Sequence, residues 1–206
     1  MSGEMEGLNG AGRGGAGRGG AGRGGDSIQG HPMEDQKKLS VDEFWITHGF
    51  LGKYKKVAKW VESSHGHYPD GAVEGGMTSS GEKLYVARAE HNGDVLPGKL
   101  HPSHSVCYVA HNGKEHGKNI YQVLVNPARS NLGWVAASRG SVPAGTLQGG
   151  RTARGEALFI GRCKHAGDLV CGKVHPSHGV CYIPYAGGEH GSQNYEVLVV
   201  KTVDLK

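Results

Sequence analysis

The chain has 206 residues, of which 37 are glycine and 36% are hydrophobic, and its formal net charge is +4. Glycine at this level suits many short strands joined by tight turns and argues against long helices. The mild positive charge does not by itself indicate a nucleic-acid partner, and because no run of about 18 apolar residues occurs, no membrane-spanning helix is predicted.

The first segment, residues 1–39, is predicted to be a disordered glycine- and arginine-rich leader. Residues 11–25 read AGRGG three times over, with no apolar periodicity, and such a tract has too little side chain to offset the entropy of ordering. An alternative interpretation is an arginine-glycine tract that contacts RNA or another anionic surface. The N-terminus lacks the apolar region of a secretory signal, so we expect a cytoplasmic protein.

Residues 40–59 are predicted to form a short helical or basic linker. Ser40 and Glu43 have the spacing of a capping box, while Gly49 and Gly52 weaken a helix, so one short helix at most is expected. Four lysines between residues 53 and 59 form either a solvated face or a patch for an anionic partner.

An internal repeat occupies most of the remaining chain. Residues 60–125 align without a gap with residues 134–199 at an offset of 74, with 33 identities in 66 positions. Each copy contains runs of 6 to 8 residues rich in β-branched and aromatic side chains, separated by turn signals. We therefore predict an all-β protein of two tandem, pseudo-symmetric repeats of short antiparallel strands, each covering what the other cannot bury alone.

The order of shared residues resembles the DM9 repeat family. The pattern runs W-V, then G-G, G-D-x-x-x-G-K, C-Y, G-x-E-H and Y-x-V-L-V in both copies. The resemblance implies an all-β fold and a lectin that recognises mannose-type glycans without a metal or other cofactor, with a role in innate immunity to microbes. It is also consistent with a homodimer.

The predicted carbohydrate-binding residues are an acid and a lysine in each G-D-x-x-x-G-K motif. Sugar hydroxyls both donate and accept hydrogen bonds, so a carboxylate and an ammonium suit them. Asp94 and Lys99 were expected to converge across the intervening VLPG turn, and Asp168 with Lys173 likewise. The alternative is that each aspartate caps a turn and each lysine is a solvated surface residue.

Four further residues join the candidate site. The resemblance places another aspartate contact of the family on Thr78 and Thr152, where threonine keeps a hydrogen bond and loses the charge. Glu115 and Glu189 either line the same pocket or accept backbone N–H groups and hold the repeat together. Arg88 and Arg162 were expected to pair with these two glutamates.

A metal site and an enzyme are the less favoured interpretations. His101 and His104 are three residues apart, as are their counterparts in the second copy, but a proline lies between them and no CxxC or HExxH motif accompanies them. No nucleophile elbow or phosphate-binding loop occurs, so we predict a binding protein and not an enzyme. The four cysteines are predicted to be free thiols, because the expected compartment is reducing.

Overall fold

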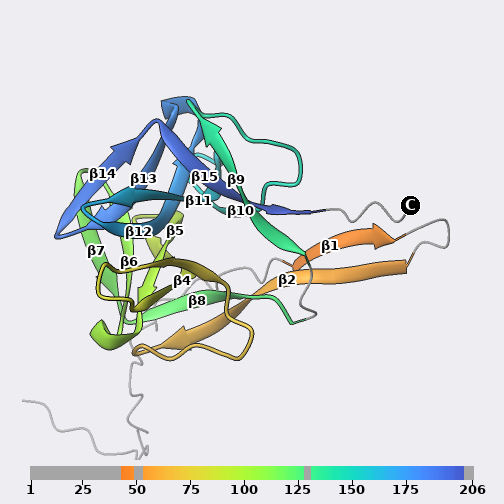
Figure 1. Cartoon of the computed structure of the whole chain (residues 1–206), viewed down its shortest axis with the longest axis horizontal. Helices are drawn as coiled ribbons and strands as arrows, with labels where there is room; N and C mark the ends of the chain where they lie inside the picture. Colours follow the sequence, from red (N-terminus) through yellow and green to blue (C-terminus); the bar gives the residue numbers. More distant parts are fainter. Residues whose placement is uncertain (1–42, 49–52, 128–130, 202–206) are drawn as a thin grey trace, which may run out of the picture. The chain divides into compact units, whose positions relative to one another are not determined.

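The computed structural model describes residues 43–48, 53–127 and 131–201, and the side chains from residue 58 onward. Fifteen strands and two 3-10 helices of three residues make up its regular structure (Figure 1). The first eight strands are β1 (Glu43–His48), β2 (Lys53–Ser64), β3 (Glu74–Met77), β4 (Lys83–His91), β5 (Asp94–His101), β6 (Val106–His111), β7 (Lys114–Lys118) and β8 (Ile120–Val125). The second repeat contains β9 (Leu132–Ser138), β10 (Gln148–Arg151), β11 (Ala157–His165), β12 (Asp168–His175), β13 (Val180–Tyr185), β14 (Gly188–Ser192) and β15 (Asn194–Val200).

The all-β prediction is confirmed, and the two copies fold in the same way. Strands β4 and β5 form a hairpin from Tyr85 opposite Leu100 to His91 opposite Asp94, and β11 with β12 repeats it. The turns use positive-φ residues, with Asn92 at 52° and Gly93 at 83° in the first hairpin. Asparagine and glycine adopt this region at little steric cost, so this dipeptide favours the register of the first hairpin. The second hairpin has Ala166 at 48° and Gly167 at 91° in the same positions.

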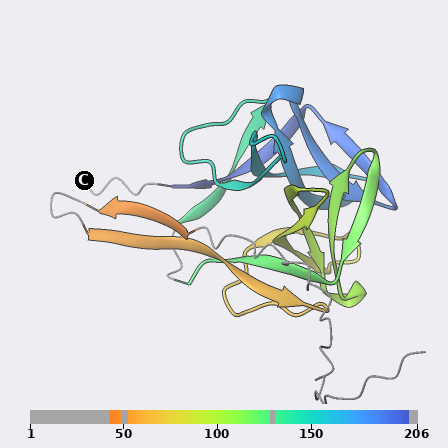
Figure 2. The same cartoon turned by 180° about the vertical axis from the view of Figure 1, so that it is seen from behind.

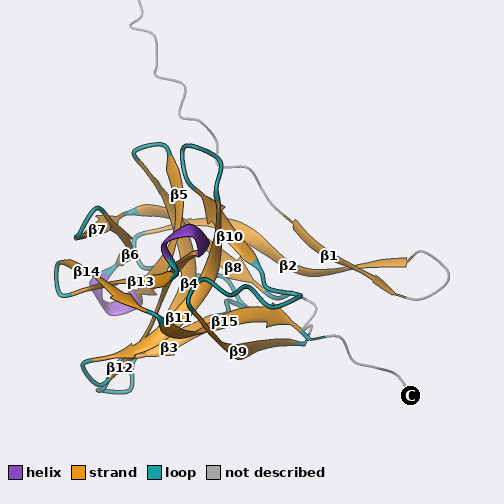
Figure 3. Cartoon of the chain, turned by 90° about the horizontal axis from the view of Figure 1, so that it is seen from above, coloured by secondary structure: helices purple, strands orange, loops and turns teal. Residues whose placement is uncertain are grey.

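The two repeats are joined through their strands. Short strand β3 of repeat 1 pairs with β12, and β10 of repeat 2 pairs with β5, by the bridges Met77 to Leu169 and Arg151 to Val95. Strands β7 and β14 also meet, at Lys114 and Gly188. Pairings β4–β5 and β11–β12 then close the strand order into rings. Figure 2 shows the first copy, in yellow to green, packed against the second, in teal to blue, and Figure 3 shows β10 beside β5 and β3 beside β12.

The hydrophobic core is shared between the repeats. One cluster of buried residues combines Trp60, Val86 and Leu124 of repeat 1 with Leu147 and Ile160 of repeat 2. All five side chains are at most 4% exposed. Burial of this kind supplies the main favourable term in folding, so neither repeat has a complete core without the other.

The segment before the repeats corrects one prediction. In place of a short helix within residues 40–59, β1 and the first half of β2 form an antiparallel pair, from Glu43 opposite Lys59 to His48 opposite Lys53. The second half of β2 pairs with β8. Because β2 is extended by this tertiary pairing, an extended β1 gains a full hydrogen-bond ladder, which outweighs a local capping preference. The leader of residues 1–39 lies outside the described residues.

The two framework arginines correct a second prediction. Arg88 lies over the Trp60 ring at 4.4 Å and its Nε donates to Gln122 at 2.8 Å. Arg162 lies over Trp134 at 4.2 Å and pairs with a glutamate of β15 at 2.7 Å. The arginines thus brace the start of each repeat against its last strand, and the glutamates of the G-x-EHG motifs pair with lysines instead.

Candidate binding sites between the repeats

Lys99 and Lys173 both reach across the boundary between the repeats. Each lies in a central strand, β5 or β12, and is at most 6% exposed. The Nζ of Lys99 donates to the carbonyl oxygen of Pro184 at 2.7 Å, and that of Lys173 to Ala110 at 2.5 Å. The interpretation of these residues as solvated surface lysines is therefore wrong.

Each lysine also forms an ion pair with the glutamate of its own repeat. Lys99 lies 3.1 Å from Glu115, and Lys173 lies 3.0 Å from Glu189, with at most 10% of any of the four side chains exposed. Buried charges of this kind require a partner and further hydrogen bonds. The pairs meet that requirement, because the lysines hold a carbonyl oxygen as well.

The glutamates complete a reciprocal contact between the two copies. The second carboxylate oxygen of Glu115 accepts the backbone N–H of Gly187, and that of Glu189 accepts the N–H of Gly113, both at 2.7 Å. These glycines lie at the tips of the β13–β14 and β6–β7 hairpins. The glutamates therefore hold the repeats together. They accept turn N–H groups as predicted, but these N–H groups belong to the opposite copy.

Asp94 and Asp168 bind a loop of the opposite repeat. Asp94 Oδ1 accepts the N–H of Ala153, and Asp168 Oδ1 accepts the N–H of Ser79, both at 2.7 Å. The predicted convergence of Asp94 with Lys99 is corrected, because residues 94–101 form one continuous strand. Five residues of strand span about 17 Å and point alternately to opposite faces.

One cavity shows which groups actually meet. It has a volume of about 390 Å³, is open to solvent, and combines residues of both repeats. Its lining residues are Asp94, His111, Asn112, Gly113, Lys173, His175, His178, Tyr182 and Glu189. We call this cavity the Asp94 site. It brings together a carboxylate of repeat 1 and the lysine–glutamate pair of repeat 2.

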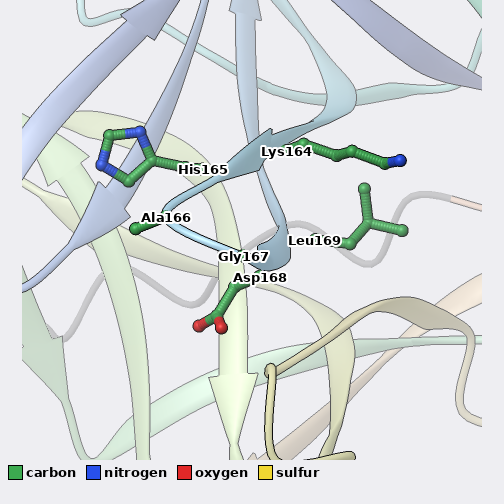
Figure 4. Close-up of a pocket in the computed structure, with 6 residues that line it drawn as sticks. All are labelled: Lys164, His165, Ala166, Gly167, Asp168 and Leu169. Atoms are coloured by element: carbon green, nitrogen blue, oxygen red, sulfur yellow. The ribbon is translucent and has the colours of Figure 1, made fainter.

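By the equivalence of the two copies, the counterpart of this cavity, which we call the Asp168 site, is assigned to Asp168 with Lys99, Glu115, Tyr108 and Tyr185. Lys99 Nζ lies 5.4 Å from the Tyr108 ring centre and 5.3 Å from that of Tyr185. A hollow of about 370 Å³ runs along the β11–β12 turn, lined by residues 164–169. In Figure 4 the Asp168 carboxylate projects from this turn, and the residue is half-buried.

Thr78 and Thr152 lie beside these sites but are engaged in their own turns. The Thr78 hydroxyl oxygen accepts the N–H of Glu82 at 3.0 Å, and Thr152 accepts that of Glu156 at the same distance. Each threonine precedes the residue whose N–H binds the aspartate of the other repeat. The threonines position the loops that donate to the aspartates, so Thr78 is associated with Asp168 and Thr152 with Asp94.

The HPSH motifs form the short 3-10 helices, and their histidines have protein partners. His101 stacks on His104 with ring centres 3.6 Å apart, and its Nε2 lies 3.1 Å from Glu82. The N–H of Ser103 donates to the same carboxylate, which lowers the pKa of Glu82. Within the described ranges, no group of three or more His, Cys, Asp or Glu side chains is arranged to hold a metal ion.

All four cysteines are buried free thiols. Burial raises the pKa of Cys171 to about 12 and that of Cys107 further above its ordinary value. These two thiols are therefore poor nucleophiles at neutral pH. The buried cysteines act as small core side chains.

A histidine cluster next to the Asp94 site gives the fold a dependence on pH. Burial lowers the pKa of His91 to about 4, and Lys118, His116 and His111 add to the effect. An unfolded histidine has a pKa near 6.5. Between these values the unfolded chain binds the proton and the folded chain does not, so stability falls as pH drops from about 6.5 to 4.

Substituting His91 by glutamine is therefore expected to reduce the loss of stability on acidification. Between pH 7 and 4.5 the free energy of unfolding, measured in urea, should fall by about 1 kcal/mol less in His91→Gln than in the parent, allowing for solvent screening. His165→Gln is the matched control, because Ser192 stands where Lys118 lies in repeat 1. Equal pH slopes for the parent and His91→Gln would contradict this assignment.

Several lining residues were not among the predicted site residues. His111, Asn112 and Tyr182 line the Asp94 site, and Tyr185 lies against Lys99. The conserved spacing of C-Y with G-K across the two copies was a usable signal for Tyr182. Residues 111 and 185 carried no such signal, because they differ between the copies.

In the part of the chain that the structure describes, no helix is long and apolar enough to cross a membrane. The fold and the two sites define an all-β, tandem-repeat protein whose polar sites are built across the boundary of its repeats. The chain belongs to the DM9 repeat family, whose model matches residues 35–116 and 84–192. This membership confirms the resemblance seen in the repeated motifs, and it suggests a lectin-like class of protein.

Two curated relatives are proteins of Thalassophryne nattereri. Natterin-4 is 30% identical over 71% of this chain, and Natterin-3 is 29% identical over 66% of it. The matched region spans about a third of the length of these relatives, 35% and 34% respectively. The nematode sperm cell motility protein MFP2B has a similar structure, with a TM-score of 0.56 and 16% identity over 73% of this chain and 48% of its own. At that identity the likeness concerns the fold alone.

Proposed function

We propose that the protein binds carbohydrate without a metal ion, at the Asp94 site and the Asp168 site. The observation that supports this most directly is the Asp94 cavity, where a carboxylate of one repeat faces the lysine–glutamate pair of the other. Charged donors and acceptors fixed by other contacts give strong, directional hydrogen bonds to hydroxyl groups. The wall also includes aromatic side chains, which suit the apolar face of a pyranose ring.

The tyrosines of both sites add neutral donors. Burial raises the pKa of Tyr182, with the charge of Glu189 adding to the effect, and the pKa of Tyr108 is raised by burial and Glu115. Both phenols therefore stay protonated across the physiological range. Mannose-type glycans and a role in recognising microbial surfaces are the finer part of the proposal and rest on the family resemblance. Two sites on one rigid body would favour a multivalent glycan.

The aspartates are the best residues for a test, because the lysines are needed for the fold. Asp94→Asn and Asp168→Asn keep an oxygen that accepts the N–H of the opposite loop and remove the charge. Loss of a hydrogen bond to a charged group should weaken mannose binding at the altered site roughly 10- to 100-fold. Calorimetric titration of the full chain with mannose, galactose and mannan, with chelator present, measures this.

The matched control is Asp70→Asn, an exposed aspartate outside both sites, which should bind like the parent. Binding that disappears in Asp94→Asn/Asp168→Asn, with an unchanged thermal midpoint, supports the proposal. Absence of heat with every sugar from the folded parent would overturn it. Binding to RNA through the leader, the alternative from the sequence, would instead fall steeply with salt.

A further inference from the structure

The two sites share one framework but differ at two neighbouring wall positions. The ion pairs measure 3.0 and 3.1 Å, and the lysines lie 5.5 and 5.4 Å from the tyrosines of the C-Y motifs. His111 and Asn112 line the Asp94 site, and repeat 2 has Tyr185 and Ala186 at the equivalent positions. Of the two, His111 contacts the aspartate of its site, so a functional difference between the sites is expected from position 111 and its counterpart 185.

His111 engages the aspartate of its site. Its Nδ1 lies 3.3 Å from Asp94 Oδ2, while Asp94 Oδ1 already accepts the N–H of Ala153. Both oxygens of Asp94 thus have a protein partner. A ligand hydroxyl that uses this carboxylate has to compete with the imidazole for Oδ2.

Tyr185 leaves the other aspartate open. Its ring lies over Lys99 at 5.3 Å and against His165 at 4.8 Å. The described residues provide Asp168 with one hydrogen bond, from the N–H of Ser79 to Oδ1. The second oxygen of Asp168 therefore faces no competing imidazole, and Lys99 lies between two tyrosine rings.

Several titratable groups surround His111. Within its own repeat these are Asp94 on β5, His91 on β4 at 5.0 Å between ring centres, and His116 on β7 at 6.2 Å. Across the cavity the charged or titratable groups are Lys173, His175, His178, Tyr182 and Glu189. Among these groups, Asp94 is the one that the structure places within ion-pair distance of the His111 ring.

We propose that the residues at positions 111 and 185 set the difference between the sites: the Asp168 site is the stronger sugar site, and the Asp94 site is weaker because the His111 ring competes with a ligand for the Asp94 carboxylate. This inference rests on the proposed carbohydrate binding. The Asp168 site has no equivalent group within contact of its aspartate among the described residues.

The test exchanges the side chains at positions 111 and 185, because each repeat already accommodates the residue that is introduced into the other. His111→Tyr places a tyrosine where repeat 2 already accommodates one, and Tyr185→His does the reverse. Mannose binding by the full chain is measured by calorimetry at pH 7.5, with Asp94→Asn and Asp168→Asn used to isolate one site at a time. The Asp168 site is expected to bind mannose about five- to tenfold more tightly than the Asp94 site.

His111→Tyr should raise the affinity of the Asp94 site toward that of the Asp168 site, and Tyr185→His should lower the affinity of the Asp168 site. Equal affinities at the two sites that neither exchange alters would overturn the inference and leave the proposed function intact. Absence of sugar binding by the parent would overturn both. A difference between the sites that persists in both exchanges would contradict the role given to residues 111 and 185.

Discussion

Replacing Lys99 or Lys173 by alanine is expected to lower the free energy of unfolding by about 3–5 kcal/mol. Each lysine neutralises a glutamate that is at most 10% exposed and 3.0 or 3.1 Å away. Alanine leaves that carboxylate buried without a counter-charge, and it also removes the donor to a carbonyl of the opposite repeat. The loss should appear in urea denaturation at neutral pH.

A matched control and a double substitution separate charge from side-chain loss. Lys114→Ala removes an exposed lysine of β7 and should change stability by less than about 0.5 kcal/mol. Lys99→Met/Glu115→Gln removes both charges while keeping most of the volume, and it should recover much of the stability lost in Lys99→Ala. If the free energy of unfolding of Lys99→Ala lies within about 1 kcal/mol of that of the parent, the Lys99–Glu115 ion pair does not stabilise the contact between the repeats.

This result would change how sugar-binding experiments are interpreted. A lysine variant that loses mannose binding has lost either a ligand contact or the buried contacts by which the lysine holds the two repeats together. The aspartate variants avoid this ambiguity, because asparagine still accepts the N–H that each aspartate binds. The role of Lys99 or Lys173 in sugar binding is therefore best tested only in variants whose stability has been measured.

The sequence predicted the repeat, the strand content and the importance of the G-D-x-x-x-G-K motif, because all three leave local, periodic signals. It did not predict which copy each side chain contacts. Half of the residues are identical in the two copies, so the same pair of residue types can meet within one copy or between the copies. A contact of Asp94 with Lys173 therefore cannot be told in sequence from a contact of Asp94 with Lys99. Only the interleaving of β3 with β12 and of β10 with β5 decides between them.

The errors in the sequence analysis have the same physical origin. Ser40 and Glu43 carry a local helix-start signal, but the strand partner offered by β2 lies in the tertiary structure and outweighs it. The glutamates at 115 and 189 were expected to meet arginines by charge alone. Lysine reaches them from two strands away in its own copy, from β5 to β7 across β6 and from β12 to β14 across β13.

Gly76→Ala and Gly150→Ala are expected to break the strand pairing that interleaves the repeats. A methyl group at Gly76 would overlap the carbonyl oxygen of Leu169, and one at Gly150 would overlap that of Val95. The obstructing atoms are backbone of the opposite copy, so relief requires β3 or β10 to move away. Overpacking that forces backbone shifts costs about 3 kcal/mol or more, and it should appear as a lower denaturation midpoint.

Gly81→Ala provides the contrast, because Gly81 has φ of 91° and nothing within 4 Å of its added methyl group. It should lose only the conformational preference of glycine, about 1–2 kcal/mol. Gly76→Ala should also weaken sugar binding selectively at the Asp168 site, since β3 carries the loop whose Ser79 N–H holds Asp168. Equal losses at both sites would mean that the two are coupled through the whole sheet, whereas an Asp168 site unaffected in Gly76→Ala would show that the loop position does not depend on β3.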